Sequence, residues 1–305
     1  MLAHRLFFGA IMVAVFVAVV VLDERFAPWY PGWLVLAVVA MCKTALEVVG
    51  LLRRTSAAPS TNTVVGGVLA LVAANWAPHV ASAVQQSGLP SSIAPGLTPA
   101  APALVFAWPL WTFVMVVMFA FIAQGAQFDR PGGTMSTIAG SVLAVTYVGL
   151  LGSFVLQMRW MDGPGEGLVA LGMLVGTAKG ADTGAYTFGR IAGRHKLWPR
   201  LSPNKTVEGA IGGLIFAVAA AVGVEALARA LLGTWFLSWG GTLVYGLVVG
   251  TAAQLGDLME SMIKRDCAQK DAGDTLPGFG GVLDVMDSLL FAGPVAYGAW
   301  LLLRP

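Results

Sequence analysis

The chain has 305 residues, of which 57% are hydrophobic and only 11% are charged, and its formal net charge is +2. Soluble domains carry about 25% charged residues, so this composition excludes an ordinary soluble protein. The small net charge gives no indication of a nucleic-acid partner, and two cysteines do not make a disulfide framework. Stretches of about 20 apolar residues recur along the chain, each long enough to cross a bilayer. We therefore predict an all-α, polytopic integral membrane protein.

Windowed hydropathy predicts about nine transmembrane helices in a single membrane domain that covers residues 1–305. Within it, residues 1–160 supply N-terminal membrane helices, and residues 161–305 supply the helices and charged loops expected to carry the site. The first span is expected to be retained, because no small-residue cleavage site follows it. The predicted spans lie near 6–22, 31–51, 63–85, 102–124, 135–157, 166–186, 207–232, 235–256 and 283–303.

Lysine and arginine residues are distributed unevenly between the two sides of the predicted bundle. With the N-terminus in the cytoplasm, 12 of the 18 basic residues lie in inside segments and 4 in outside segments; Lys43 and Lys179 lie within spans. The positive-inside rule favours this orientation. It places both strongly charged segments, 187–206 and 257–282, on the cytoplasmic side of the cytoplasmic membrane.

The first polar cluster occupies residues 179–209. Lys179 and Asp182 are three residues apart, so they share one face of a helix, where they either hold helices together as a pair or face a polar cavity. A basic strip at 190–205, which includes Lys196, either contacts anionic lipid headgroups or lines a site. The turn that begins at Ser202 predicts a helix start at Thr206, and Lys205 beside it indicates an anion site.

The second polar cluster starts in the stretch QLGDLMESMIKRD. Asp257, Ser261 and Lys264 follow the spacing i, i+4, i+7 and line one face of a helix. Asp284 and Asp287 are spaced i, i+3 at the start of the last apolar span. Carboxylates on two helix ends, together with lysines, are typical of a magnesium ion that holds phosphate groups.

The alternative interpretation of this second cluster is a solvent-exposed loop whose charged side chains form salt bridges with one another. It explains Lys264 and Asp266, but it does not explain Asp284 and Asp287, which have no basic residue nearby in the sequence. A site for phosphoryl or nucleotidyl transfer is therefore favoured. The sequence has no GxxxxGK[ST] loop, no Ser–His–Asp arrangement and no zinc-ligand spacing.

The segment GDLMESMIKRDCAQKDAGDTLPGFGGVLDVMDSL, residues 256–289, resembles the signature of the phosphatidate cytidylyltransferases (CDP-diacylglycerol synthases). The pattern of that family runs roughly S-x-x-K-R, four residues, K-D, and then P-G-H-G-G-x-x-D-R-x-D. The upstream stretches DTGAYTFGR and GRHKLWPRLSPNKTVEG are similar to a second stretch of the family. Together these matches cover most of residues 180–290.

The resemblance implies a magnesium-dependent membrane enzyme that converts CTP and phosphatidate into CDP-diacylglycerol and pyrophosphate. It leaves open a second, monovalent cation and leads us to expect a homodimer. The implied catalytic residues are Asp257, Asp284, Lys205 and Lys264. The implied metal ligands are Asp257 and Asp284, supported by Asp271 and Asp287. The residues expected to bind substrate are Ser202, Ser261, Arg265, Lys270, Asp182 and Lys196.

Two positions depart from the family pattern. Phe279 replaces its histidine and Val285 replaces its arginine, which removes a donor and a cation beside the expected metal site. Three alternatives therefore remain: a related transferase that acts on another lipid, an ion-coupled transporter that uses the intramembrane charges, and a noncatalytic lipid-binding protein.

Overall fold

The protein is described by a computed structural model that covers residues 2–86, 105–161, 165–276, 278 and 280–304. Its architecture is helical, and the one sheet in the described residues is a two-stranded hairpin. Seven helices in this part of the chain are long and apolar enough to cross a membrane. The prediction of an all-α integral membrane protein is confirmed, whereas the number nine and the single membrane domain stay predictions.

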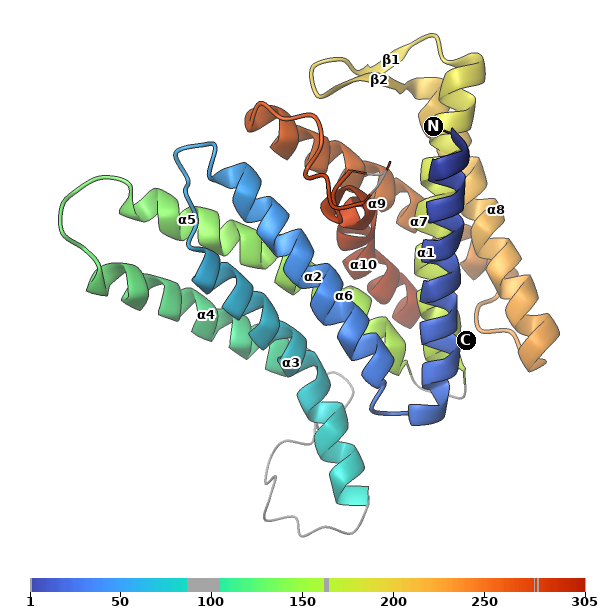
Figure 1. Ribbon diagram of the computed structural model, residues 1–305. Coiled ribbons are helices and arrows are strands. Elements are labelled where there is room, and N and C mark those ends of the chain that lie inside the picture. Colours follow the sequence, from blue (N-terminus) through green and yellow to red (C-terminus); the bar gives the residue numbers. More distant parts are fainter. Residues whose placement is uncertain (1, 87–104, 162–164, 277, 279, 305) are drawn as a thin grey trace. The chain divides into compact units, whose positions relative to one another are not determined.

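The chain divides into two compact units, residues 1–156 with 272–283 and residues 157–271 with 284–305. The first unit contains α1 (Leu2–Leu22), α2 (Pro31–Leu52), α3 (Thr61–Gln86), α4 (Ala107–Ala126) and α5 (Thr134–Ala144). A π-helical segment (Val145–Leu150) and α6 (Leu151–Gln157) continue from α5 (Figure 1). A short 3-10 turn (Asp23–Phe26) precedes α2. Each predicted span from 6–22 to 135–157 overlaps one of these helices.

The start of α2 shows how local chemistry sets a helix boundary. Pro31 stands in the first turn, where a missing N–H costs nothing. The carboxylate of Asp23 accepts hydrogen bonds from the backbone N–H groups of Gly32 and Trp33, at 3.0 and 2.7 Å. These N–H groups have no partner inside the helix, so the buried carboxylate stabilises the helix start.

Glu47 on α2 anchors the segment 272–283 within the first unit. Its carboxylate accepts hydrogen bonds from the Thr275 hydroxyl at 2.8 Å and from the N–H groups of Val282 and Leu283, at 3.0 and 2.8 Å. Leu283 is the first residue of α10 (Leu283–Leu303). A Cβ atom at Gly281 would collide with the Glu47 carboxylate, so a larger residue there would have to displace this carboxylate from its hydrogen bonds.

The second unit is built on α7 (Glu166–Ala192), α8 (Val207–Leu232), α9 (Trp239–Asp266) and α10. A short 3-10 turn (Met158–Trp160) precedes α7. Helices α7 and α8 lie side by side (Figure 1). The two helices approach closely at Gly184, where an added Cβ atom would lie 2.6 Å from the Gly212 carbonyl oxygen. The absence of a side chain at this position permits the approach. Small residues at a helix contact are the usual means of packing helices in a membrane, where apolar side chains gain nothing by leaving lipid.

A β-hairpin joins α7 to α8, formed by β1 (Lys196–Trp198) and β2 (Ser202–Thr206). The hydroxyl of Thr206 accepts a hydrogen bond from Gly209 N at 3.1 Å and caps α8, so the predicted helix start is confirmed. Glu208 accepts from the N–H groups of Arg194 and His195 and ties the base of the hairpin to α8. The strands themselves were not predicted, because the segment shows no alternation of apolar and polar residues.

Two boundaries in the second unit differ from the hydropathy prediction. Helix α7 continues to Ala192, and α9 continues to Asp266. Residues 257–266 are therefore helical, which agrees with the predicted helix face of Asp257 and Lys264, although the hydropathy span ended at residue 256. A hydropathy window detects apolar composition, whereas a polar segment of good helix formers continues a helix once it has begun. Lys264 and Arg265 in the last turn of α9 also favour its extension, since cations stabilise a helix C-terminus.

We predict that Glu47→Ala loosens the segment that precedes α10. The substitution leaves two backbone donors without an acceptor, at a cost of about 1–3 kcal/mol. Amide hydrogen exchange of residues 280–283 in detergent should become faster by at least about tenfold, because local opening becomes easier. Glu47→Gln keeps one carbonyl acceptor and should have a smaller effect. Unchanged exchange in Glu47→Ala would contradict the anchoring role.

Candidate functional site

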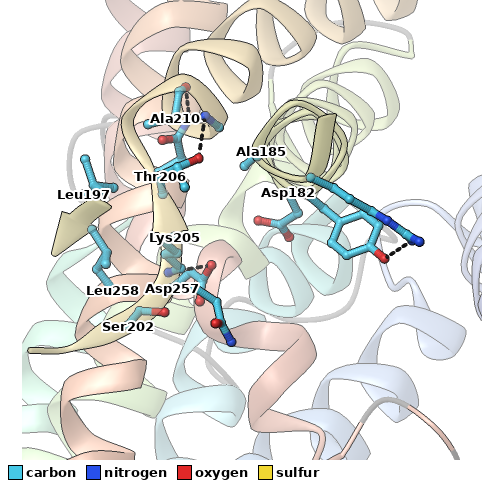
Figure 2. A pocket seen from close by; sticks show the side chains of 15 residues that line it. Asp182, Ala185, Leu197, Ser202, Lys205, Thr206, Ala210, Asp257 and Leu258 are labelled. Atoms are coloured by element: carbon cyan, nitrogen blue, oxygen red, sulfur yellow. Dashed lines mark hydrogen bonds and ion pairs between the residues drawn. The ribbon is translucent and has the colours of Figure 1, made fainter. Parts of the chain in front are cut away.

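A cavity of about 520 Å³ lies in the second unit, bounded by α7, the hairpin, α8 and α9. Lys205 on β2 forms an ion pair with Asp257 on α9, with 2.8 Å between Nζ and Oδ2. Figure 2 shows this pair, with the carboxylate of Asp182 on α7 facing the same space. The charged and amide side chains at the cavity wall are those of Asp182, Arg190, Asn204, Lys205, Gln254 and Asp257. The cavity therefore offers cations and carboxylates together, which suits a ligand with phosphate groups.

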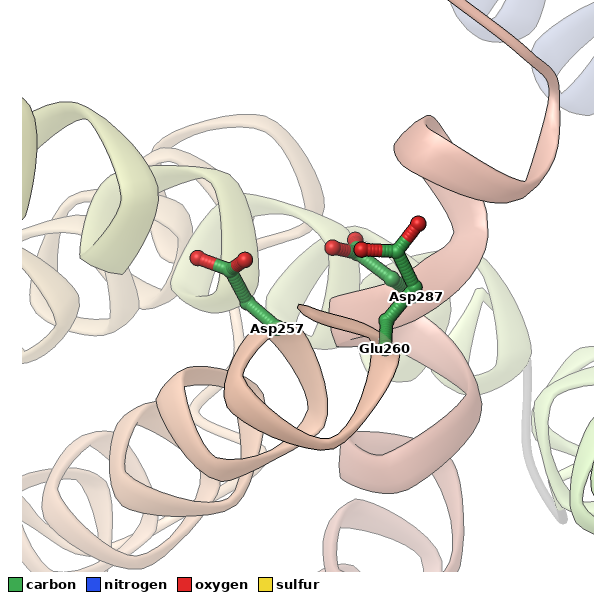
Figure 3. Close-up of side chains that lie close together, drawn as sticks. All are labelled: Asp257, Glu260 and Asp287. Atoms are coloured by element: carbon green, nitrogen blue, oxygen red, sulfur yellow. The ribbon is translucent and has the colours of Figure 1, made fainter. Parts of the chain in front are cut away.

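Three carboxylates come together beside this cavity. Asp257 and Glu260 project from α9, and Asp287 projects from α10 (Figure 3). One oxygen of each lies within 4.8 Å of the others. Asp287 is 6% exposed and Glu260 is fully buried. Like charges held this close in a buried place repel one another, and either a shared proton or nearby cations relieve that repulsion.

Lys264 supplies one such cation. Its ammonium nitrogen lies 2.5 Å from Glu260 Oε2 and 2.6 Å from Asp284 Oδ1, so it joins α9 to the first turn of α10. The Lys264 and Asp284 side chains are only 12% and 11% exposed. In the described residues, Glu260 Oε1 has no hydrogen-bond partner. A buried carboxylate oxygen without a donor is costly, and a bound cation would satisfy it.

The charges around the cavity and the cluster do not balance. Five carboxylates stand against three lysine ammonium groups and the Arg190 guanidinium; Lys179, the third lysine, forms an ion pair with Asp182 at 2.9 Å. When all are ionised, a negative charge remains, which a bound cation would offset. Carboxylate oxygens are the ligands that hard divalent cations prefer. The carboxylates are those of Asp182, Asp257, Glu260, Asp284 and Asp287.

The predicted metal ligands are therefore only partly brought together. Asp257 and Asp287 are in the carboxylate cluster, whereas Asp284 is the partner of Lys264. Asp271 is exposed in the turn that follows α9 and is not one of the three clustered carboxylates of the described residues. Their assignment as metal ligands stays a prediction.

The predicted substrate-binding residues separate into three groups. Asp182 and Ser202 line the cavity. Ser261 is buried on α9, directly after Glu260. The remaining three are exposed: Lys196 at the start of β1, Arg265 donating to the Gln269 carbonyl oxygen, and Lys270 in the turn after α9. Phe279, which replaces the histidine of the family pattern, lies outside the described residues.

Glu260 is the site residue that the sequence interpretation missed. It stands three residues after Asp257 and four before Lys264, so it shares their helix face. Because α9 extends beyond its apolar part, the i, i+3 and i, i+4 spacings apply to all three residues. That periodicity was the available signal, because the sequence interpretation already placed Asp257 and Lys264 on one helix face.

Comparison with known proteins identifies a family that this chain matches. The model of the family described as "Cytidylyltransferase family" matches residues 3–303. The chain is 38% identical over 154 residues to the phosphatidate cytidylyltransferase of Staphylococcus saprophyticus, an alignment that covers 50% of this chain and 55% of that protein. It is 37% identical over 164 residues to the phosphatidate cytidylyltransferase of Bacillus subtilis, covering 54% and 58%. The chain thus spans about half the length of the curated relatives it matches.

We predict that Lys264→Met destabilises the second unit. The substitution leaves the buried Glu260 carboxylate without its cation, which costs about 3–5 kcal/mol in comparable sites. Denaturant titration in detergent micelles should show this loss as a lower free energy of unfolding.

A double variant and a control make the Lys264 prediction specific. Lys264→Met combined with Glu260→Gln should recover part of the stability, because the uncompensated charge is gone. Lys270→Met changes an exposed lysine that follows Lys264 closely in the sequence, and it should have little effect on the free energy of unfolding. If Lys264→Met is as stable as the unsubstituted protein, the ion pairs do not stabilise the fold.

Proposed function

Because this chain belongs to the cytidylyltransferase family, we propose that it transfers the cytidylyl group of CTP to phosphatidate, which yields CDP-diacylglycerol and pyrophosphate. The relatives that carry the name phosphatidate cytidylyltransferase support this choice of substrates. One observation on the structure carries the proposal. Asp257 belongs both to the wall of the cavity and to the carboxylate cluster, so a ligand in the cavity lies next to the place where a cation would bind.

The proposed reaction is a direct displacement at phosphorus. A phosphate oxygen of phosphatidate attacks the α-phosphorus of CTP and forms the new P–O bond. The bond from the α-phosphorus to the bridging oxygen breaks, and its electron pair leaves with pyrophosphate. No covalent enzyme intermediate is needed. The protein therefore has to orient the two phosphates in line and to stabilise the negative charge that accumulates on the leaving group.

Lys205 and Lys264 are assigned different tasks in this reaction. Lys205 faces the cavity and would exchange its contact with Asp257 for the phosphate oxygens of the nucleotide. Such an exchange frees Asp257 to ligate a cation. Lys264 is buried between Glu260 and Asp284 and would keep both carboxylates ionised and in position. Asp182, which is paired with Lys179, lines the same cavity and would restrict where the phosphate groups can lie.

Magnesium is the proposed cation, held by Asp257, Glu260 and Asp287, with Asp284 close by as the partner of Lys264. Each of the three carboxylates offers one oxygen within 4.8 Å of the others, and carboxylate oxygens are the ligands that magnesium prefers. When bound, the ion would neutralise phosphate charge and polarise the bonds to phosphorus. Lys205 and Lys264 would supply the remaining positive charge.

The location and assembly of the enzyme are further parts of the proposal. The excess of basic residues in the predicted inside segments supports a cytoplasmic-membrane protein with its N-terminus and site in the cytoplasm. CTP is a polar substrate and would reach the site from the water, whereas phosphatidate would arrive from the lipid. A homodimer is expected from the family resemblance.

The decisive experiment is a pyrophosphate-release assay on the purified protein with CTP, phosphatidate and magnesium, together with detection of CDP-diacylglycerol. We expect activity that EDTA abolishes and that Asp284→Asn removes. Lys205→Met should lower kcat by about 10²- to 10³-fold, the usual cost of removing one electrostatic contact to the reacting groups. Lys43→Met replaces a lysine of α2 outside the site and should keep full activity.

Two results would change this proposal. Bound CTP without product, in the presence of phosphatidate, would require a different lipid acceptor, which competing acceptors in one assay would identify. A protein that binds neither CTP nor a divalent cation would be a noncatalytic lipid-binding protein.

A further inference from the structure

Lys179 is a charged residue of α7 to which the proposed reaction assigns no role. A lysine ammonium has three N–H donors. Those of Lys179 meet three acceptors: Asp182 Oδ2 at 2.9 Å, the Val285 carbonyl oxygen at 3.0 Å and Ser288 Oγ at 2.9 Å. The donor set is fully used, and two of the three bonds cross from α7 to α10.

The two contacts on α10 flank Asp287. Val285 and Ser288 are one turn apart on this helix, and Asp287 lies between them in the sequence. Ser288 is fully buried; its backbone N–H donates to Asp287 Oδ1 at 2.5 Å, and its hydroxyl donates to Asp182 Oδ2 at 3.4 Å. Lys179, Asp182 and Ser288 thus form a closed set of hydrogen bonds next to one carboxylate of the cluster.

The contact to a backbone carbonyl distinguishes Lys179 from a residue that only balances charge. An ion pair with Asp182 alone would tolerate many positions of α10. A donor bound to the Val285 carbonyl fixes the helix backbone itself, and the bond to Ser288 fixes its rotation about the helix axis. Both restrict where the Asp287 oxygens can lie relative to Asp257 and Glu260, which project from another helix.

We infer that Lys179 is a positioning residue, which holds the first turns of α10 against α7 so that Asp287 meets Asp257 and Glu260 at the cation site. This inference rests on the proposed function for its kinetic consequences, but its effect on cation binding does not require turnover. The family pattern has an arginine at the position of Val285. The Lys179 ammonium, which binds the Val285 carbonyl oxygen, therefore brings a positive charge close to the position where that arginine would stand.

The first test measures the binding of Mn²⁺ alone to the detergent-purified protein, by the electron paramagnetic resonance signal of the free ion. Loss of a residue that orients metal ligands costs about 10- to 100-fold in metal affinity, so Lys179→Met should bind Mn²⁺ more weakly by that factor. A lysine that merely repels the cation predicts the opposite change, since its removal would strengthen binding. Lys179→Arg keeps charge and donors and should recover at least part of the affinity.

The second test is kinetic and uses the same proteins. A displacement of about 1 Å within a site costs about 10²-fold in rate. If Lys179→Met displaces Asp287, kcat should fall by that order, while KM for CTP should change much less. Ser288→Ala should show a smaller loss in the same direction. Because both residues act through α10, the double variant should lose less than the product of the two single effects.

Lys43→Met is the matched control, since it removes a lysine from an apolar helix of the first unit that is not among the residues of the cavity or the carboxylate cluster. Mn²⁺ affinity that is unchanged or higher in Lys179→Met, with the control normal, would overturn the inference. Multiplicative losses in the double variant would also overturn it. If the unsubstituted protein binds Mn²⁺ but forms no CDP-diacylglycerol, the proposed function fails while the positioning role is still decided by the binding result. Absence of Mn²⁺ binding in the unsubstituted protein would overturn both.

Discussion

Lys264 lies between two carboxylates, 2.5 Å from Glu260 Oε2 and 2.6 Å from Asp284 Oδ1, in a place where little water reaches any of the three. Bringing charges out of water costs several kcal/mol per ion, and only close opposite charges and hydrogen bonds offset that cost. In the second unit, three lysines offset this cost, each through an ion pair with one or two carboxylates. Lys179 pairs with Asp182, Lys205 with Asp257, and Lys264 with two partners.

The lysines do not neutralise all of the negative charge, and the unbalanced charge lies in the carboxylate cluster. Asp287 belongs to the carboxylate cluster, yet none of the three lysine ion pairs includes it. Glu260 Oε1 has no hydrogen-bond partner in the described part of the chain. A fold that only needed stability would do better with apolar side chains at these positions. An excess of negative charge beside a cavity lined by Lys205 and Arg190 fits the proposed nucleotide substrate, since its phosphates and a divalent cation would enter together.

Helix geometry turns this charge pattern into a site. Asp257, Glu260 and Lys264 share a face because α9 stays helical to Asp266. The hairpin positions Lys205 immediately before the cap of α8, so its side chain and the start of that helix face the same cavity. In the first unit, the carboxylate of Glu47 serves a related purpose on the backbone, because it binds donors that α10 leaves open at its start.

The sequence by itself determined the helical membrane architecture, because hydropathy over about 20 residues follows directly from bilayer thickness. It also determined that Asp257 and Lys264 share a helix face, since the spacing of residues on a helix is fixed. Only the tertiary structure decided that Lys264 meets Asp284 and that Lys179 meets Val285 and Ser288, 106 and 109 residues away in the chain. Contacts between distant segments depend on how helices pack, and packing follows the shapes of many side chains that no local pattern records. For the same reason Asp284, which appears without a basic neighbour in the sequence, has a lysine partner in the folded protein.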